Sequence, residues 1–275
     1  MAVRTKRTRT LDSVKFALLG VIALVMLAPL LFGLYTSLLD PTDYLSWVSP
    51  NKLTLSNYRY VIENAPVLTW YRNTLMVTGA VVLGSVVVNT LAGYVLAKFR
   101  FAGRRFVFLG IIAILMVPVQ AYLIPLYLQV NDLGWLNTLT ALIIPFIANP
   151  LLIFLMRQTF STLPQELDDA AAVDGAGRFR TFIQIGVPLA MTGIATQAIL
   201  AGTWTWNSFM IPVTMNNDPD KFMLTVGLNS LQAQNYTLPT VQMAGVVLLT
   251  IPVVAMFVVF QRFIVPSLAS SGIKG

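Results

Sequence analysis

The densest group of acidic side chains in the 275-residue sequence lies in residues 163–179, LPQELDDAAAVDGAGRF. Four of the eleven acidic residues of the chain fall here: Glu166, Asp168, Asp169 and Asp174. The sequence contains no histidine and no cysteine, which removes the usual zinc and copper ligands, thiol nucleophiles and a Ser-His-Asp triad. We therefore expect no catalytic residue and no metal site, and we interpret the acids as groups that meet a partner.

Three of these acids fall in the first turns of a predicted short helix. Thr162 is placed to cap its N-terminus, and Pro164 would lie near the start of the first turn, where a missing N–H costs little. Glu166, Asp168 and Asp169 would then lie near the positive end of the helix dipole, which favours negative charge. Charge and capping agree on where the helix begins.

Gly175 predicts where this helix ends. A helix that stops at Val173 or Asp174 leaves the next residue in the left-handed conformation, which glycine adopts without a steric penalty. Residues 170–172 are all alanine, so the helix would be slim. A slim helix with an acidic rim suits insertion into a basic cleft on a second protein; a capped surface helix that binds nothing is the alternative. The helical repeat separates two faces, with Leu167, Ala171 and Asp174 on one and Glu166, Asp169 or Ala170, and Val173 on the other.

The rest of the sequence is apolar, and this composition indicates lipid as its main solvent. The chain is 56% hydrophobic and 11% charged, with a mean hydropathy of +0.74, whereas soluble domains average about 25% charged residues. A helix of about 20 apolar residues crosses a bilayer. Six segments qualify, which predicts an all-α integral membrane protein with six transmembrane helices, and several contain prolines that should kink them. The segments are residues 16–38, 74–97, 106–130, 139–156, 182–204 and 241–264.

The distribution of Lys and Arg predicts the orientation of these segments. With the N-terminus in the cytoplasm, 14 of the 18 basic residues fall on the cytoplasmic side, as the positive-inside rule expects. Both termini and the acidic loop, about residues 157–181, are then cytoplasmic. The same bias accounts for the net charge of +7 without nucleic acid as a partner. We expect a basic N-terminal segment (1–15), one six-helix transmembrane domain (16–265) and a cytoplasmic tail (266–275).

The sequence carries no energy source of its own. The central parts of the six segments contain no ionisable residue, so no proton relay can be drawn through them. The chain also lacks the G-x-x-x-x-G-K-[ST] phosphate loop. If the protein moves a solute uphill, the energy must arrive from another polypeptide, and the acidic loop is the cytoplasmic segment large enough to receive one.

The acidic loop resembles the EAA loop of ABC-importer permeases, whose pattern is E-A-A-x₃-G-x₉-I-x-L-P. Asp169-Ala170-Ala171 is followed by three residues and Gly175, then by nine residues and Ile185-Gly186-Val187-Pro188. Two residues depart from the pattern, since Asp169 replaces Glu and Val187 replaces Leu; both keep the charge or the apolar character. The resemblance implies that this helix couples the permease to its ATPase. The residues that it assigns to coupling are Glu166, Asp168, Asp169, Ala170, Ala171, Asp174, Gly175 and Pro188.

Longer stretches are similar to the maltose-type carbohydrate-uptake branch of that family, such as WNSFMIPVTMNNDPDKFMLTVGL and the ending SGIKG, which is similar to the tail of the smaller permease subunit. The resemblance implies a type I ABC importer permease fold in a bacterial or archaeal plasma (inner) membrane. It also implies a second permease as heterodimer partner, an external substrate-binding protein, and an ATPase dimer that binds ATP and Mg. This chain would bind no cofactor. The alternatives are the same architecture for another solute, such as glycerol phosphate or an oligopeptide, and a non-transporting scaffold that docks a cytosolic partner.

Uncharged polar and aromatic residues at membrane depth are the candidates for the solute path. An unsatisfied amide in lipid is costly, so such groups either line the path or bond to a neighbouring helix. Tryptophans near a span end can stack on a sugar ring or anchor the helix at the lipid headgroups. Small and polar residues at i, i+4, i+8 in residues 85–93 indicate helix packing. The candidate path residues are Gln120, Tyr122, Asn149, Trp204, Trp206 and Asn207.

Overall fold

The structure is a computed structural model that describes residues 6–234 and 238–271, and this part of the chain is helical throughout its regular elements. It divides into two compact units, Met1–Ala65 with Leu228–Thr250, and Pro66–Gly227 with Ile251–Gly275. Residues 1–5 of the predicted N-terminal segment and 272–275 of the predicted tail lie outside the described residues.

The first unit is built from the two ends of the chain. It contains α1 (Lys6–Ser37), η1 (Pro41–Asp43), η2 (Pro50–Lys52), α2 (Ser56–Asn64), and parts of α13 (Leu224–Gln234) and α14 (Pro239–Ser271). The buried Asn57 ties them together: its Nδ2 donates to the carbonyl oxygens of Ser37 (2.9 Å) and Leu39 (2.6 Å), and its Oδ1 accepts from Thr240 Oγ1 (3.2 Å). A buried amide satisfied on both sides fixes the end of α1 against α2 and the start of α14.

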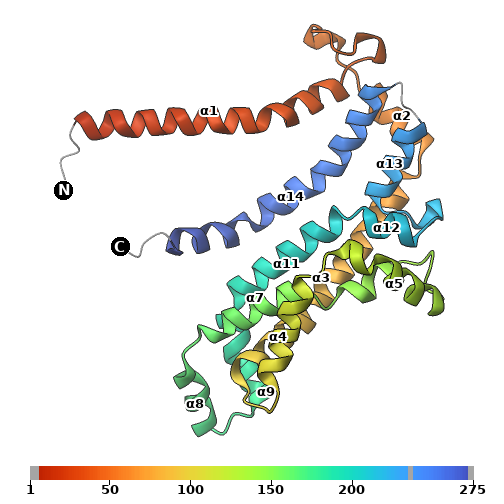
Figure 1. Cartoon of the computed structure of the whole chain (residues 1–275). Coiled ribbons are helices and arrows are strands. Elements are labelled where there is room, and N and C mark those ends of the chain that lie inside the picture. The colour runs from red at the N-terminus through yellow and green to blue at the C-terminus, as the bar shows by residue number, and fades with distance from the viewer. Residues whose placement is uncertain (1–5, 235–237, 272–275) are drawn as a thin grey trace. The chain divides into compact units, whose positions relative to one another are not determined.

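The second unit is centred on three helices that pack side by side, α3 (Val67–Lys98), α7 (Pro150–Ser161) and α11 (Met191–Trp206) (Figure 1). One end of the unit carries α8 (Gln165–Val173) and α9 (Arg178–Thr181), and the other carries α5 (Val119–Asp132) and α12 (Met210–Met215). The remaining elements are α4 (Arg104–Leu115), α6 (Thr140–Ile143), η3 (Ile144–Phe146), η4 (Phe182–Gly186), α10 (Val187–Leu189) and η5 (Pro219–Lys221).

α3 contributes to both apolar cores of this unit. At one end Val77 and Val81 pack in a cluster with α5, α6 and α12, and at the other Tyr94 packs in an aromatic cluster with Phe160 and Phe182. Between these cores the side chains that α3 buries are polar. One long helix therefore carries apolar and polar buried groups at different positions along its axis.

The packing predicted for residues 85–93 is confirmed, and its partner is α7 of the same chain. A Cβ added to Gly93 would come within 2.5 Å of Met156 Cβ and 2.7 Å of the Arg157 backbone nitrogen. Only a residue without a side chain allows α3 and α7 to approach this closely.

The predicted spans are reproduced as helical segments, two of them bent. Residues 15–37, 67–98 and 140–161 are long and apolar enough to cross a membrane, and α14 covers the sixth predicted segment. The third predicted span is α4 followed by α5, which meet at an angle of 102° where Pro118 precedes α5. The fifth bends by 76° at Ala190, two residues after Pro188. The expectation that prolines kink the spans holds at these two breaks.

Candidate functional site

The start of α8 differs from the prediction, because Thr162 does not cap it. Thr162 closes α7 instead: its backbone is in the right-handed helical region (φ −84°, ψ −11°), and its Oγ1 donates to the Thr159 carbonyl at 2.8 Å. Pro164, in an extended conformation, precedes the first helical residue, Gln165, and offers no side-chain cap. Since α7 continues through Ser161 and α8 begins at Gln165, only three residues connect the two helices. Thr162 is the C-cap of α7 and is therefore not available as the N-cap of α8.

The end of α8 is as predicted. The helix stops at Val173, Asp174 follows as its C-cap, and Gly175 takes a left-handed φ of 75°. The backbone N–H of Ala176 donates to the Ala171 carbonyl (2.9 Å), and that of Gly175 donates to the Ala172 carbonyl (3.1 Å). These two bonds form a Schellman motif, which satisfies the last carbonyls of the helix.

An ion pair attaches α8 to the end of α3. Lys98 Nζ, on the last residue of α3, lies 2.8 Å from Asp168 Oδ2, and the two side chains are 9% and 20% exposed. The same ammonium donates to the Leu163 carbonyl at 2.9 Å, so Lys98 holds both α8 and the turn that leads into it. Breaking a largely buried pair leaves an uncompensated charge, which costs about 3 kcal/mol. Asp168, predicted to meet the partner, pairs within the chain with Lys98.

A cavity of about 510 Å³ lies between α8 and the end of α3. Asp168 and Asp169 both line it from α8. Arg178 borders it, with its guanidinium carbon 4.6 Å from the centre of the Phe99 ring. The other lining residues are Tyr94, Lys98, Arg100, Gln165, Ala172, Ala176 and Thr181.

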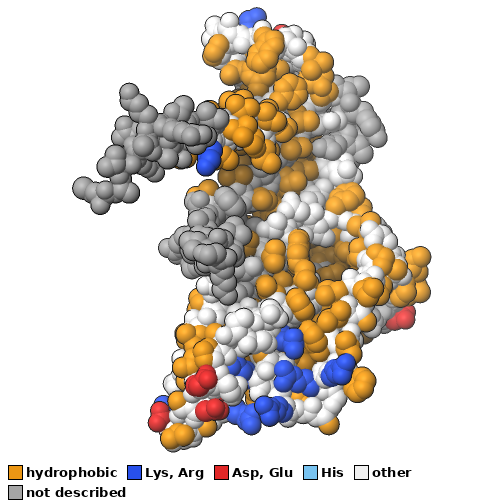
Figure 2. Space-filling view, turned by 60° about the vertical axis from the view of Figure 1, so that its left-hand side comes forward, with side chains coloured by type: hydrophobic (Ala, Val, Ile, Leu, Met, Phe, Trp, Pro, Cys, Tyr) orange, Lys and Arg blue, Asp and Glu red, His pale blue; other side chains and the backbone are white. Residues whose placement is uncertain are grey.

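Most of α8 away from Asp168 and Ala171 is exposed. Glu166, Asp169 and Asp174 are exposed; Asp169 also lines the cavity and accepts a 3.4 Å bond from Gln165 Nε2. Val173 is 88% exposed. Figure 2 shows acidic side chains gathered at the end of the unit that carries α8, beside a group of Lys and Arg side chains. The outward face therefore combines negative charge with an exposed apolar side chain.

The predicted coupling residues do not all share this face. Ala171 is buried on the side of Asp168, and Ala170 is exposed between Glu166 and Val173. Pro188 lies further along the chain in α10, next to the bend at Ala190. The structure thus divides the predicted set into an outward group, an attachment group and a distant proline.

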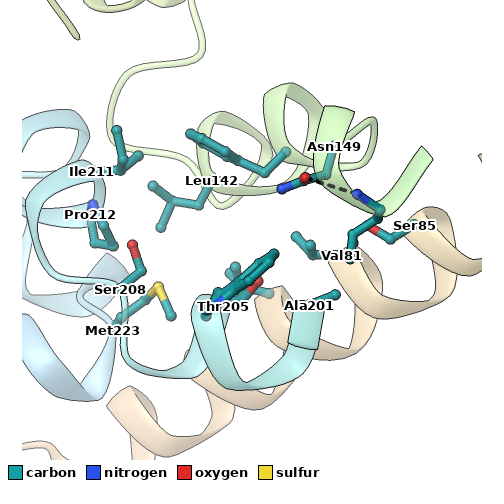
Figure 3. A pocket seen from close by; sticks show the side chains of 14 residues that line it. Val81, Ser85, Leu142, Asn149, Ala201, Thr205, Ser208, Ile211, Pro212 and Met223 are labelled. Carbon is teal, nitrogen blue, oxygen red and sulfur yellow. Dashed lines mark hydrogen bonds between the residues drawn. The ribbon is translucent and has the colours of Figure 1, made fainter. Parts of the chain in front are cut away.

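A second site is a cavity of about 150 Å³ in the middle of the same unit (Figure 3). Val81 and Ser85 reach it from α3, Ala201 and Thr205 from α11, and Leu142 from α6. Its walls are mostly apolar, with neutral polar groups between them. Such a lining can hold a neutral solute by contact and hydrogen bonds. The other lining residues are Val77, Phe146, Asn149, Leu152, Trp204, Ser208, Ile211, Pro212 and Met223.

Asn149 organises one wall of this cavity by capping α7. Its Oδ1 accepts a hydrogen bond from the Leu151 N–H at 3.0 Å. In a continuous helix this N–H would donate to the Ile147 carbonyl, so that carbonyl needs another donor. Ser85 Oγ (2.9 Å) and Asn89 Nδ2 (3.2 Å) donate to that carbonyl, and Asn89 Oδ1 accepts from the Asn149 N–H (3.0 Å). A polar network therefore joins α3 to the break before α7. The side-chain oxygen of Asn149 is already occupied by the hydrogen bonds that cap α7.

The structure brings two of the six predicted path residues to the cavity, Asn149 and Trp204. Trp206 points away from it: it is 3% exposed and its ring centre lies 6.3 Å from that of Tyr71. Asn207 Nδ2 donates to the Thr203 carbonyl (2.8 Å). Gln120 and Tyr122, both on α5, are exposed and do not line the cavity.

Thr205 and Ser208 line the cavity and were not predicted. Helical spacing could have found them, because Ala201, Trp204, Thr205 and Ser208 follow the i, i+3, i+4, i+7 pattern of one face. Trp206 lies off that face. The sequence alone does not say which of the two tryptophans faces the cavity. Once Trp204 is known to face it, helical spacing selects Thr205 and Ser208 as well.

The comparisons with known proteins are consistent along the chain. The family model described as binding-protein-dependent transport system inner membrane component matches residues 89–270, which include α8 and most of the residues that line the cavity of Figure 3. An arabinooligosaccharides transport system permease protein of Halalkalibacterium halodurans is 36% identical over 82% of this chain and 81% of its own length. A diacetylchitobiose uptake system permease protein of Streptomyces coelicolor is 31% identical over 95% of this chain and 88% of its own.

The fold is also similar to that of a solved structure. A chain in the crystal structure of a bacterial ABC transporter involved in the import of the acidic polysaccharide alginate superposes with a TM-score of 0.81 at 26% identity. The match covers 95% of this chain and 99% of that one. The chain therefore belongs to the family of binding-protein-dependent transport system inner membrane components, the permease subunits of ABC importers.

Proposed function

We propose that this permease forms, with a second permease, the membrane path for a sugar or related polyol, and that α8 is the helix through which a separate ATPase drives it. The observation that carries the proposal is the arrangement of α8: it is tied to α3 by the Lys98–Asp168 pair, while Glu166 and Val173 on its opposite face, and Asp169 at its side, are exposed. A helix held on one side and open on the other is suited to pass a partner's movement to the transmembrane helices.

An oligosaccharide is the solute that the observations favour. Relatives carry the names of permeases for arabinooligosaccharides, diacetylchitobiose and maltodextrin. The cavity contains Ser85, Thr205, Ser208 and Trp204 and no ionisable residue. Hydroxyls and an aromatic face match the neutral, hydrogen-bonding surface of a sugar, whereas glycerol phosphate would leave its charge without a cation in this lining.

We further propose six spans in a bacterial or archaeal inner membrane, with both termini and α8 in the cytoplasm. The concentration of Lys and Arg in the predicted cytoplasmic segments supports this orientation. The partners would be a second permease, an ATPase dimer that binds ATP and Mg, and an extracytoplasmic substrate-binding protein. This chain would contain no cofactor of its own.

The orientation can be tested with single cysteines, because the natural sequence contains none. We expect Val173→Cys to react with a membrane-impermeant maleimide only after the membrane is opened, and Ser49→Cys to react in intact cells, since both positions are exposed and the model of six spans places them on opposite sides. The cysteine-free parent is the control. Labelling of Val173→Cys in sealed cells with the inner membrane intact would overturn the proposed topology.

Transport itself is tested with the complex reconstituted in sealed vesicles that contain ATP. We expect uptake of a radiolabelled neutral oligosaccharide, selected by a ligand screen on the cognate binding protein, and none without ATP or without the binding protein. A vesicle that hydrolyses ATP in response to the loaded binding protein yet accumulates no member of the panel would contradict the solute class. A complex that shows no ATP-dependent response to any loaded binding protein would contradict import.

A further inference from the structure

A basic pocket lies beside the N-terminus of α4 and shares only Arg100 with the cavity next to α8. It has a volume of about 440 Å³, and four arginines line it together with aromatic residues and no acid. Four cations around one space repel each other unless an anion neutralises them. The lining residues are Arg100, Phe101, Gly103, Arg104, Arg105, Phe106, Phe108 and Arg157.

Arg157 is the group that points most directly to a ligand. Its guanidinium carbon lies 3.8 Å from the centre of the Phe108 ring, which fixes the plane of the group. Its Nε is buried and has no hydrogen-bond partner among the described residues. A buried cationic donor without an acceptor is expensive, so the site is energetically incomplete in the chain alone.

The backbone around the pocket also favours an anion. Arg104 donates to the carbonyls of Phe99 (3.0 Å) and Ala97 (3.2 Å), which fixes the loop between α3 and α4. Gly103, with a left-handed φ of 83°, precedes α4, and the first N–H groups of that 12-residue helix carry a partial positive charge. Arg100 and Arg105 are exposed at the rim. Guanidinium groups bind phosphate oxygens through paired N–H donors, so the chemistry that fits is a phosphate.

We propose that this pocket binds the phosphate of an anionic phospholipid. A lipid is favoured over free phosphate because the rim is apolar as well as basic: Phe106 is 77% exposed, Phe101 is 42% exposed, and α4 contains no buried residue, so an acyl chain can lie along it. The assignment to a lipid rests on the proposed topology, which places the arginines at the cytoplasmic leaflet, where anionic lipids attract basic pockets.

The test is titration of the intact transporter complex in detergent with phosphatidylglycerol and, separately, with phosphatidylcholine, with bound lipid counted by native mass spectrometry. We expect one tightly held phosphatidylglycerol per copy of this chain. Arg157→Gln should weaken its binding about tenfold or more, because a charge-assisted contact to phosphate is lost. Arg105→Gln, which changes an exposed side chain and leaves the fold intact, should weaken it in the same direction. Lys15→Gln removes an exposed cation outside the pocket and is the matched control.

The results separate the possible sources of the phosphate and separate this proposal from the transport function. Equal binding of the two lipids by the wild-type complex, or unchanged phosphatidylglycerol binding in both arginine variants, would overturn the proposal. Displacement of the bound lipid by millimolar inorganic phosphate would assign the pocket to free phosphate and overturn the lipid assignment. Lipid binding needs neither ATP nor solute, so a complex that imports none of the sugars tested still gives a decisive result here.

Discussion

Asp168→Lys is expected to lower uptake at least tenfold and to release the ATPase from the complex, because it places a second ammonium where Lys98 Nζ now meets a carboxylate at 2.8 Å. The side chains are largely buried, so water screens the repulsion poorly. α8 would detach from α3 while the transmembrane helices remain packed. Uptake in sealed vesicles, together with copurification of the ATPase, measures both effects.

The charge-swapped double variant Lys98→Asp with Asp168→Lys is the matched control. It restores an ion pair and should recover part of the uptake lost in each single variant. Full recovery is not expected, since an aspartate at position 98 cannot donate to the Leu163 carbonyl. The swap also places a cation in the first turn of α8 and an anion at the last residue of α3, and each reversal opposes the helix dipole by about 0.3–1 kcal/mol. Wild-type uptake in Asp168→Lys, or a double variant no better than either single one, would contradict the attachment role.

The parts of α8 that depend on neighbouring backbone could be predicted from the sequence. Gly175 follows the helix and takes a positive φ, and no other residue type does this as easily. The start of α8 could not be predicted in the same way. From the sequence, Thr162 fits equally well as the N-cap of α8 and as the C-cap of α7, which is its place in the structure. Which of the two roles Thr162 takes depends on how far α7 extends, and that depends on how α7 packs against the other helices.

The partner of each polar side chain is a tertiary property, and there the predictions were incomplete. The face of α8 that carries Asp168 turns inward because Lys98, far earlier in the chain, lies against it. Likewise, Trp206 is buried because Tyr71 lies beside it, whereas Trp204 reaches the cavity. Helical periodicity shows which residues share a face, but it does not say which face meets another helix.

Basic residues near the helix ends illustrate the same limit. Counting them predicts an orientation, and on that view Lys98 and Arg104 are interchangeable topology signals. In the structure their contacts differ: Lys98 holds α8, and Arg104 fixes the loop before α4 through two backbone carbonyls. The count treats all basic residues of a segment alike, whereas the individual contacts depend on where each side chain lies.

Asp169→Lys, at an exposed residue next to Asp168 but outside the ion pair with Lys98, is expected to abolish uptake by a different route. Asp169 is exposed and makes only a 3.4 Å bond with Gln165, so reversing its charge should leave the fold and membrane insertion unchanged. If the outward face of α8 enters a basic cleft on the ATPase, a lysine there replaces attraction by repulsion, which costs several kcal/mol in a desolvated interface. We expect normal thermal stability of the purified permease pair, loss of ATPase copurification, and uptake reduced at least tenfold.

Asp169→Glu is the matched control, because it keeps the charge, adds one methylene, and introduces the residue found in the family pattern. It should transport at the wild-type rate. The two adjacent acids then give distinguishable results: the defect of Asp168→Lys is relieved by a change within this chain, at Lys98, whereas the defect of Asp169→Lys is not, since its partner lies on another subunit. Relief of Asp169→Lys by Lys98→Asp, or ATPase binding and uptake unchanged in Asp169→Lys, would show that the exposed face of α8 is not the docking surface.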